Sequence, residues 1–182
     1  PMEVKETDLS LNYGEEFPEF HERLLASLND AQSGLYLFHG APGTGKSSYI
    51  KHLLASNLKR KVAYVPVALI AQLTSPEMLP LLMEHKNTIL VMEDAEKALL
   101  SRDSLEGSPT IVSTILNLTD GFIGQALNIS VIATFNTARE NIDEALLRKG
   151  RLRMSYEFRK LDKGESRKLA ESIGADPQEI HE

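Results

Sequence analysis

The sequence predicts an α/β fold with a mostly parallel central sheet, and two observations support this prediction. Short apolar runs, which are typical of buried strands, alternate along the chain with segments whose apolar residues recur at helical spacing. One of these runs, Thr88–Met92, is continuously apolar and bounded by polar residues, as expected for a central parallel strand that is covered on both faces. Chains that alternate in this way place helices on the faces of a parallel sheet.

The expected elements follow one another in a regular order. Strands are predicted over residues 34–39, 62–67, 88–92, 129–135 and 154–158. Helices are predicted over residues 16–30, from the glycine-rich stretch after the first strand to about residue 58, around residues 79–83 and over residues 108–118. Residues 101–108 and 121–128 are expected to form loops, and the polar chain from Lys163 onward is expected to be helical.

The composition fits a globular domain and narrows the possible functions. The 182 residues suffice for one domain with a sizeable core, and 42% apolar and 25% charged residues are ordinary values. A net charge of −6 without a run of basic residues gives no support for nucleic-acid binding, and no apolar run approaches the length of a membrane span. The chain has no cysteine, which excludes disulfides and thiolate metal sites and favours a reducing compartment, so a cytoplasmic location is expected.

The first predicted strand and helix enclose the sequence Gly-Ala-Pro-Gly-Thr-Gly-Lys-Ser at residues 40–47. This sequence matches the P-loop pattern G-x-x-x-x-G-K-[ST], and its strand–loop–helix context is the one that phosphate binding requires. Lys46 supplies a cation for the phosphates, and the Ser47 hydroxyl is a ligand for Mg²⁺. We therefore expect ATP or ADP with Mg²⁺, held in the three-layer α-β-α sandwich of P-loop NTPases, in preference to a chance glycine-rich turn. The residues expected to contact the nucleotide are Ala41, Pro42, Gly43, Thr44, Gly45, Lys46, Ser47 and Ser48.

An acidic pair, Glu93 and Asp94, follows the strand predicted over residues 88–92. One carboxylate at this position can orient the Mg²⁺ shell, and a second can activate the attacking water. We expect Glu93 to serve as the metal ligand and Asp94 to serve the water, which reverses the Asp-then-Glu order usual in such ATPases. The alternative is a pair of acids that cap the strand end in solvent. Glu96 is expected to be supporting or solvated.

Asn136 ends the strand predicted over residues 129–135. Its amide can donate to a γ-phosphate oxygen and accept from a water, although Asn at a strand end is also a common turn former. The sequence Asp-Glu-Ala-Leu-Leu-Arg-Lys-Gly-Arg follows at residues 143–151, and it places Arg148 and Arg151 on either side of Gly150. By residue count alone, a surface salt-bridge cluster of the two arginines with the acids at positions 143 and 144 would be favoured.

Taken together, the P-loop, the acidic pair, the Asn136 strand and the Arg-x-Gly-Arg sequence resemble the AAA family of AAA+ ATPases over about residues 13–158. This resemblance implies that Asn136 positions the hydrolytic water. It also implies that Arg148 and Arg151 act as arginine fingers in the nucleotide site of the neighbouring subunit. A looser match suggests that Tyr13 and Gly14 contact adenine.

The ATPase module is also similar to one branch of this family, the mitochondrial AAA translocase of the folded Rieske iron–sulfur protein. The reversed acidic pair and residues 73–79 and 115–121 carry this similarity. As in that branch, the chain has no aromatic–hydrophobic–Gly triplet of threading unfoldases between residues 67 and 82. Residues 1–160 are expected to form the AAA+ α/β subdomain, and residues 161–182 the start of a truncated helical lid or tail, so that the lid is largely missing.

The resemblance implies an oligomeric, Mg²⁺-dependent ATP hydrolase that remodels or translocates a macromolecule. A ring of six or seven subunits is expected, with a protein substrate and without nucleic acid. Three alternatives stay open: a P-loop kinase, a nucleotide-binding switch or scaffold with little hydrolysis, and a DNA-handling AAA+ protein. The five histidines show no metal-ligand spacing, and each is expected on the surface or on a helix face; they are His21, His39, His52, His85 and His181.

Overall fold

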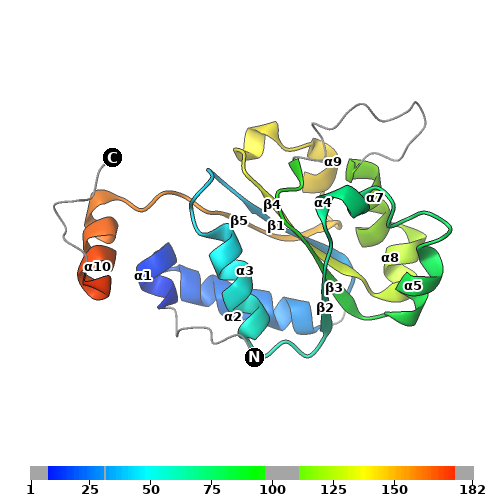
Figure 1. Cartoon of the computed structure of the whole chain (residues 1–182), viewed down its shortest axis with the longest axis horizontal. Coiled ribbons are helices and arrows are strands. Elements are labelled where there is room, and N and C mark those ends of the chain that lie inside the picture. The colour runs from blue at the N-terminus through cyan, green and yellow to red at the C-terminus, as the bar shows by residue number, and fades with distance from the viewer. Residues whose placement is uncertain (1–7, 31, 97–110, 175–182) are drawn as a thin grey trace.

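The structure is a computed structural model that describes residues 8–30, 32–96 and 111–174. These residues form an all-parallel, five-stranded sheet with the strand order β2-β3-β4-β1-β5 (Figure 1). The strands are β1 Gly34–His39, β2 Lys61–Tyr64, β3 Thr88–Met92, β4 Ser130–Phe135 and β5 Leu152–Glu157. Because β1 lies between β4 and β5, the glycine-rich loop that follows β1 leaves the sheet from an interior strand.

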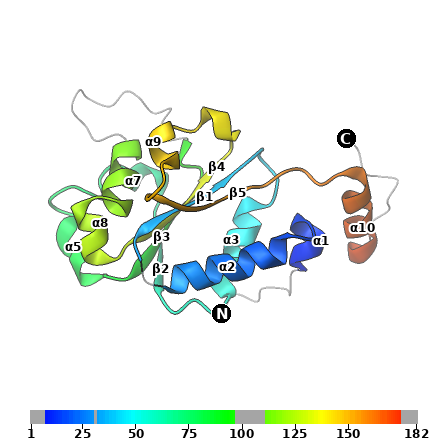
Figure 2. The ribbon, with the colours of Figure 1, turned by 180° about the vertical axis from the view of Figure 1, so that it is seen from behind.

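Helices cover both faces of the sheet, which confirms the predicted three-layer sandwich (Figures 1 and 2). The helices are α1 Leu9–Tyr13, α2 Phe17–Asn29, α3 Lys46–Ala55, α4 Val67–Ile70, α5 Leu79–Glu84, α7 Ile111–Thr119, α8 Phe122–Leu127, α9 Glu144–Leu147, α10 Lys163–Ile173 and the 3₁₀ helix η1 Arg139–Asn141. None of the helices in the described part of the chain is long and apolar enough to cross a membrane.

Each face of the sheet has its own hydrophobic core, because successive side chains of a strand point to opposite faces. Leu35 and Leu37 of β1 pack in the core that contains α7 and α8, whereas Tyr36 and Phe38 pack in the core that contains α2 and α3. All residues of β1, β3 and β4 are buried. Burial on both faces explains why these strands are mostly apolar, as predicted for Thr88–Met92.

The strand predicted over residues 62–67 is shorter than expected and lies at the edge of the sheet. β2 ends at Tyr64, its four residues are exposed, and Pro66 caps the start of α4. The apolar residues of β2 and α4 form one run in the sequence, so the pattern did not separate the strand from the helix. The helix after the glycine-rich loop also ends earlier than expected, at Ala55.

The loop predicted over residues 121–128 is wrong, because this segment contains α8. Gly121 and Gly124 suggested a loop, but Gly124 has a packing role. A Cβ at this position would lie 2.0 Å from the carbonyl oxygen of Leu118, so only glycine allows α8 to approach α7 this closely. The predicted start of the preceding helix near residue 108, and the predicted loop over residues 101–108, lie outside the described residues.

The histidine prediction is wrong for His39, which is buried within β1. His21 does lie on a helix face, as expected, but that face of α2 is buried against α3. There Nδ1 of His21 lies 2.9 Å from the hydroxyl of Tyr49. In the part of the chain that the structure describes, no group of three or more histidine and acidic residues could hold a metal ion.

The helix predicted from Lys163 onward is α10, and it lies beside α1 and apart from the sheet in both views (Figures 1 and 2). Asp162 and Glu165 begin this helix with reciprocal hydrogen bonds, in which each side chain accepts from the backbone N–H of the other residue. The division of the chain near residue 160 stays a prediction.

Arg60 is a buried cation that joins several backbone segments at the amino-terminal ends of β3 and β4. Its guanidinium donates to the carbonyl oxygens of Leu28, Asn87, Thr88 and Asn128 and to the Ser130 hydroxyl. Among the described residues no carboxylate pairs with it, so its charge is stabilised by dipoles alone. Burial lowers the pKa of Arg60.

Replacing Arg60 with Met should lower the free energy of unfolding by about 2–4 kcal/mol, because several buried acceptors lose their donor. Urea unfolding followed by circular dichroism measures this change. Lys61→Met is the matched control, since Lys61 is exposed on the edge strand and its replacement should change the stability by less than about 0.5 kcal/mol. Equal stabilities of the two variants would contradict the role given to Arg60.

Candidate functional site

The glycine-rich loop between β1 and α3 has the backbone conformation of an anion-binding cradle. Gly43 and Gly45 have φ angles of 78° and 89°, in the left-handed region that favours glycine. Gly40 approaches the chain after β5 so closely that a Cβ would lie 2.2 Å from the Phe158 carbonyl oxygen. Gly45 is the N-cap of α3, so the free N–H groups and the positive dipole end of this helix face the loop.

Lys46, the first residue of α3, bends back over this loop. Its ammonium donates to the carbonyl oxygens of Gly40 at 2.9 Å and Ala41 at 2.8 Å, and the residue is only 5% exposed. Burial lowers the pKa of Lys46, and the negative charges of Glu96 and Asp94 oppose this shift. The lysine is therefore a buried cation within electrostatic range of the acidic residues after β3.

The acidic residues after β3 lie beside the end of β4, because the two strands are parallel neighbours. The backbone N–H of Asp94 donates to Oγ1 of Thr134 at 2.9 Å, and the N–H of Ala95 donates to the Thr134 carbonyl oxygen. Asp94 has a φ of 53°, a conformation that Asp tolerates better than most residues. These bonds turn the chain across the end of β4.

Asn136 joins two of these carboxylates. Its side-chain nitrogen donates to Oδ1 of Asp94 at 2.7 Å and to Oε1 of Glu96 at 2.9 Å. Both amide hydrogens are thus engaged, and the side-chain oxygen is the group that can accept a further hydrogen bond. Oε1 of Glu93 is buried and has no hydrogen-bond partner among the described residues.

Tyr13 contacts the loop from the amino-terminal side of the domain. Its hydroxyl donates to the Gly45 carbonyl oxygen at 3.2 Å, and a Cβ at Gly45 would lie 2.9 Å from its ring. The ring packs against Phe17 and Phe158, and burial raises the pKa of Tyr13 to about 12. Gly14, with a φ of 102°, ends α1 directly after it. Tyr13 therefore packs against the loop and stabilises its conformation, in addition to any contact with a ligand.

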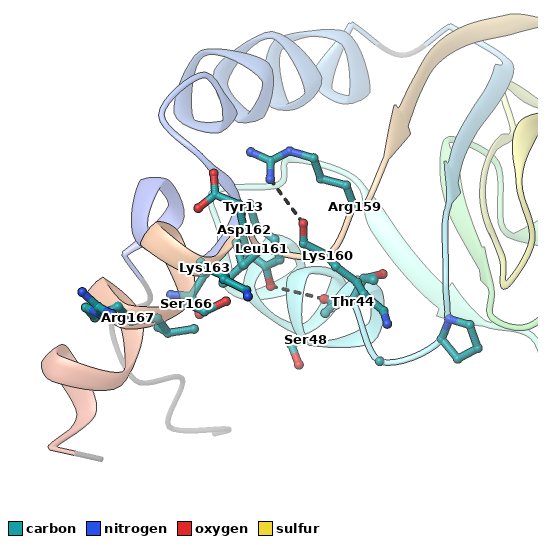
Figure 3. Close-up of a pocket in the computed structure, with 15 residues that line it drawn as sticks. Tyr13, Thr44, Ser48, Arg159, Lys160, Leu161, Asp162, Lys163, Ser166 and Arg167 are labelled. Atoms are coloured by element: carbon teal, nitrogen blue, oxygen red, sulfur yellow. Dashed lines mark hydrogen bonds between the residues drawn. The ribbon is translucent and has the colours of Figure 1, made fainter. Parts of the chain in front are cut away.

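A cleft of about 1200 Å³ opens between the loop and α10 (Figure 3). Of the residues predicted to bind nucleotide, Tyr13 and several loop residues line it; the loop residues are Pro42, Gly43, Thr44, Gly45 and Ser48. The opposite wall comes from residues 159–169 and carries Arg159, Lys160, Lys163 and Arg167. Arg159 forms a two-pronged ion pair with Glu165, at 2.6 Å and 2.7 Å, which lowers the pKa of Glu165 to about 2.

The two predicted fingers, Arg148 and Arg151, lie apart from this cleft in the same chain. Arg148 is exposed at the end of α9. Its carbonyl oxygen accepts from the N–H groups of Arg151 and Leu152, whereas its guanidinium forms no hydrogen bond or ion pair with the described residues. Nε of Arg151 donates to Oδ2 of Asp120 at 2.6 Å. The alternative cluster with residues 143 and 144 is therefore not formed, since Asp143 instead caps α9 through the Ala145 N–H.

The structure thus brings together the loop, Tyr13, Lys46, Asp94 and Asn136, and it leaves the two arginines outside this group. Sequence reasoning undervalued Glu96, which is part of the hydrogen-bonded set and not a solvated side chain. It also missed Thr134, whose hydroxyl holds the Asp94 backbone. The position of Glu96, two residues after Asp94, was the one feature of the sequence that could have indicated its place in the site.

A glycine cradle at a helix N-terminus, a buried lysine and carboxylates at the end of another strand of the same sheet define a P-loop nucleotide-binding protein. The chain belongs to the AAA family, because residues 36–160 match the "ATPase family associated with various cellular activities (AAA)". The predicted fold and family are thereby confirmed. Tyr13 and Gly14 lie outside the matched residues.

Individual relatives agree with the family match. AAA-ATPase At2g46620 of Arabidopsis thaliana is 32% identical over 124 residues, which are 68% of this chain and 24% of that protein. The mitochondrial chaperone BCS1 of Homo sapiens is 30% identical over 126 residues, 64% of this chain and 29% of BCS1. BCS1 of Bos taurus is 30% identical over 128 residues, 65% of this chain and 30% of that protein. The predicted similarity to a mitochondrial AAA protein is confirmed, and the chain spans less than a third of these relatives.

Proposed function

We propose that this chain binds ATP with Mg²⁺ and hydrolyses it, as one subunit of an oligomeric motor that remodels or translocates a protein. The observation that carries the proposal is the pair of carboxylates bridged by Asn136 within electrostatic range of the buried Lys46. A site that only bound phosphate would need the loop and the lysine, but it would not need two carboxylates joined by an amide. A cytoplasmic location belongs to the same proposal.

The residues present fit a nucleotide and its metal ion. The left-handed glycines and the start of α3 form a cradle that phosphate oxygens can enter. Ser47 exposes a hydroxyl at the start of α3. Oε1 of Glu93, which has no partner in the part of the chain that the structure describes, is a second hard oxygen donor, as Mg²⁺ prefers. When bound, Mg²⁺ would neutralise charge on the phosphate oxygens.

The roles of the remaining side chains follow from their hydrogen bonds. The oxygen of a water attacks the γ-phosphorus, the bond to the leaving β-phosphate oxygen breaks, and Asp94 takes the proton from the water. Asn136 accepts a hydrogen bond from this water through its side-chain oxygen, because its nitrogen is engaged by the carboxylates. Lys46 balances the charge of the transferred phosphoryl group.

Assembly into a ring of six or seven subunits is part of the proposal, and the exposed Arg148 supports it. The Arg148 guanidinium has no partner among the described residues, and α9 is separated from the start of α3 in both views (Figures 1 and 2). An arginine finger supplied to the neighbouring subunit needs this freedom. Arg151 is better placed to shape its own subunit through Asp120.

Phosphate release from Mg²⁺-ATP, measured without any acceptor substrate, tests the proposed reaction against a P-loop kinase.

Lys46→Ala should weaken ATP binding about 10- to 150-fold, the value of one charge-assisted contact, and phosphate release at low ATP should fall accordingly. Lys51→Ala is the matched control, since Lys51 is exposed on the same helix. Tight binding without phosphate release would favour the nucleotide-binding switch.

A further inference from the structure

We propose that Glu96 is a positioning residue for hydrolysis, which acts by holding the Asn136 amide in the orientation that the water requires. The inference rests on the proposed ATP hydrolysis and adds a residue to it. The Glu93-Asp94 pair accounts for the metal and the water, but neither role explains why the Asn136 amide also contacts the carboxylate of Glu96. Glu96 supplies the second of the two hydrogen bonds that fix this side chain.

The path of the backbone brings Glu96 to this place. Asp94 adopts a left-handed conformation, and the N–H groups of Asp94 and Ala95 are both bonded to Thr134. This tight turn directs the next residue back toward the end of β4, where Asn136 lies. A non-glycine residue in the left-handed region costs about 1 kcal/mol, and such conformations cluster at functional sites. The turn therefore brings the Glu96 carboxylate to the Asn136 amide, which a chain that simply left the strand end would not do.

The second carboxylate oxygen of Glu96 argues against a purely structural role. Oε2 is buried and has no hydrogen-bond partner among the described residues, whereas Oε1 accepts from Asn136. Leaving a buried carboxylate oxygen unpaired is unfavourable, and a residue kept only for stability would be expected to have both oxygens bonded. The negative charge of Glu96 also lies within range of Lys46. Glu96 thus belongs to the same charge arrangement as the phosphate-binding loop.

Two hydrogen bonds to one amide determine its direction. With Asp94 alone, the Asn136 side chain could rotate about a single contact. The bond to Glu96 removes this freedom and leaves Oδ1 pointing away from both carboxylates. A small misplacement of a group that orients a reacting water is enough to lower the rate strongly. The effect of losing Glu96 should therefore be on turnover and not on ATP binding.

Steady-state kinetics of a double-mutant cycle test this role. Glu96→Ala should lower kcat about 10- to 100-fold with KM changed less than about threefold. Glu96→Gln keeps an acceptor oxygen for the amide and should recover most of the loss. If Glu96 acts through Asn136, the double variant Glu96→Ala/Asn136→Ala should be no slower than Asn136→Ala alone. Additive losses, or an unchanged kcat in Glu96→Ala, would overturn the proposal. Glu140→Ala, at an exposed acid in η1, is the control.

The side-chain amide resonance of Asn136 gives a readout that does not depend on hydrolysis. It is assigned by its disappearance in Asn136→Ala, and it should shift and exchange faster with solvent in Glu96→Ala but not in Glu140→Ala. An unchanged resonance in Glu96→Ala would contradict the positioning role, whether or not the protein turns over. If the wild-type protein releases no phosphate while the resonance responds as expected, the proposed hydrolysis fails and the hydrogen-bond geometry stands.

Discussion

Replacing Arg148 with Ala should lower the turnover of the assembled protein by about 10³- to 10⁵-fold and leave ATP binding unchanged. The guanidinium is exposed at the end of α9 and has no partner among the described residues, so its removal disturbs no contact within its own subunit. The substitution removes a positive charge that, in the proposed assembly, would stabilise the transferred phosphoryl group in the nucleotide site of the neighbouring subunit. Phosphate release and equilibrium binding of a fluorescent ATP analogue measure the two quantities separately.

A mixing experiment tells whether this arginine acts between subunits. Arg148→Ala keeps an intact loop, and Lys46→Ala keeps an intact finger, so a mixed assembly contains interfaces at which both intact halves meet. At low ATP, where each variant alone is impaired, mixing the two should therefore restore part of the turnover. Failure of the mixture to recover activity, although the subunits assemble, would contradict a finger in trans. Arg151→Ala is a useful comparison because it should also lower stability, through loss of the pair with Asp120.

Replacing Asp94 with Asn should lower kcat by about 10²- to 10⁴-fold, the usual contribution of a general base, with little change in KM. The amide of the new side chain cannot take the proton from the water, yet it has nearly the same shape. The Thr134 contact should survive, because it involves the Asp94 backbone and not the carboxylate. Single-turnover phosphate release, compared with ATP binding under the same conditions, separates the two effects.

The outcome also bears on the reversed acidic pair. If Asp94→Asn leaves turnover unchanged, Asp94 is not the water-activating group, and Glu93 or Glu96 would have to be tested in its place. If Glu93→Gln instead raises the Mg²⁺ concentration needed for activity, the two roles are divided as the sequence predicts. The Mg²⁺ dependence of the two variants therefore distinguishes the metal ligand from the base.

Much of the fold could be predicted because the interior strands are buried on both faces. The residues of β1, β3 and β4 are mostly apolar for this reason, and the boundaries of these strands are close to those predicted. The P-loop could be recognised because its glycines and Lys46 must have fixed spacing to form the cradle. The parallel pairing of β3 with β4 then places the acids near Asn136, as expected for neighbouring strand ends.

The features that were missed depend on contacts between segments that are distant in sequence. Gly124 resembles a loop residue until its packing against Leu118 is known. Arg60 resembles a surface cation, although its guanidinium is buried among carbonyl oxygens. The pairing of Arg151 with Asp120 joins residues 31 positions apart, and no local sequence pattern predicts it. Glu96 is close in sequence to the acidic pair, but its contact with Asn136 depends on the left-handed conformation of Asp94, two positions before it.

The contacts of Lys46 have a consequence for affinity. Its ammonium is already satisfied by the carbonyl oxygens of Gly40 and Ala41, so it is not a bare charge awaiting a phosphate. Nucleotide binding is then an exchange reaction, in which phosphate oxygens replace backbone carbonyls around the same cation. The measured affinity reports the difference between these two sets of partners. A change that only weakens the carbonyl contacts should tighten nucleotide binding without touching the nucleotide.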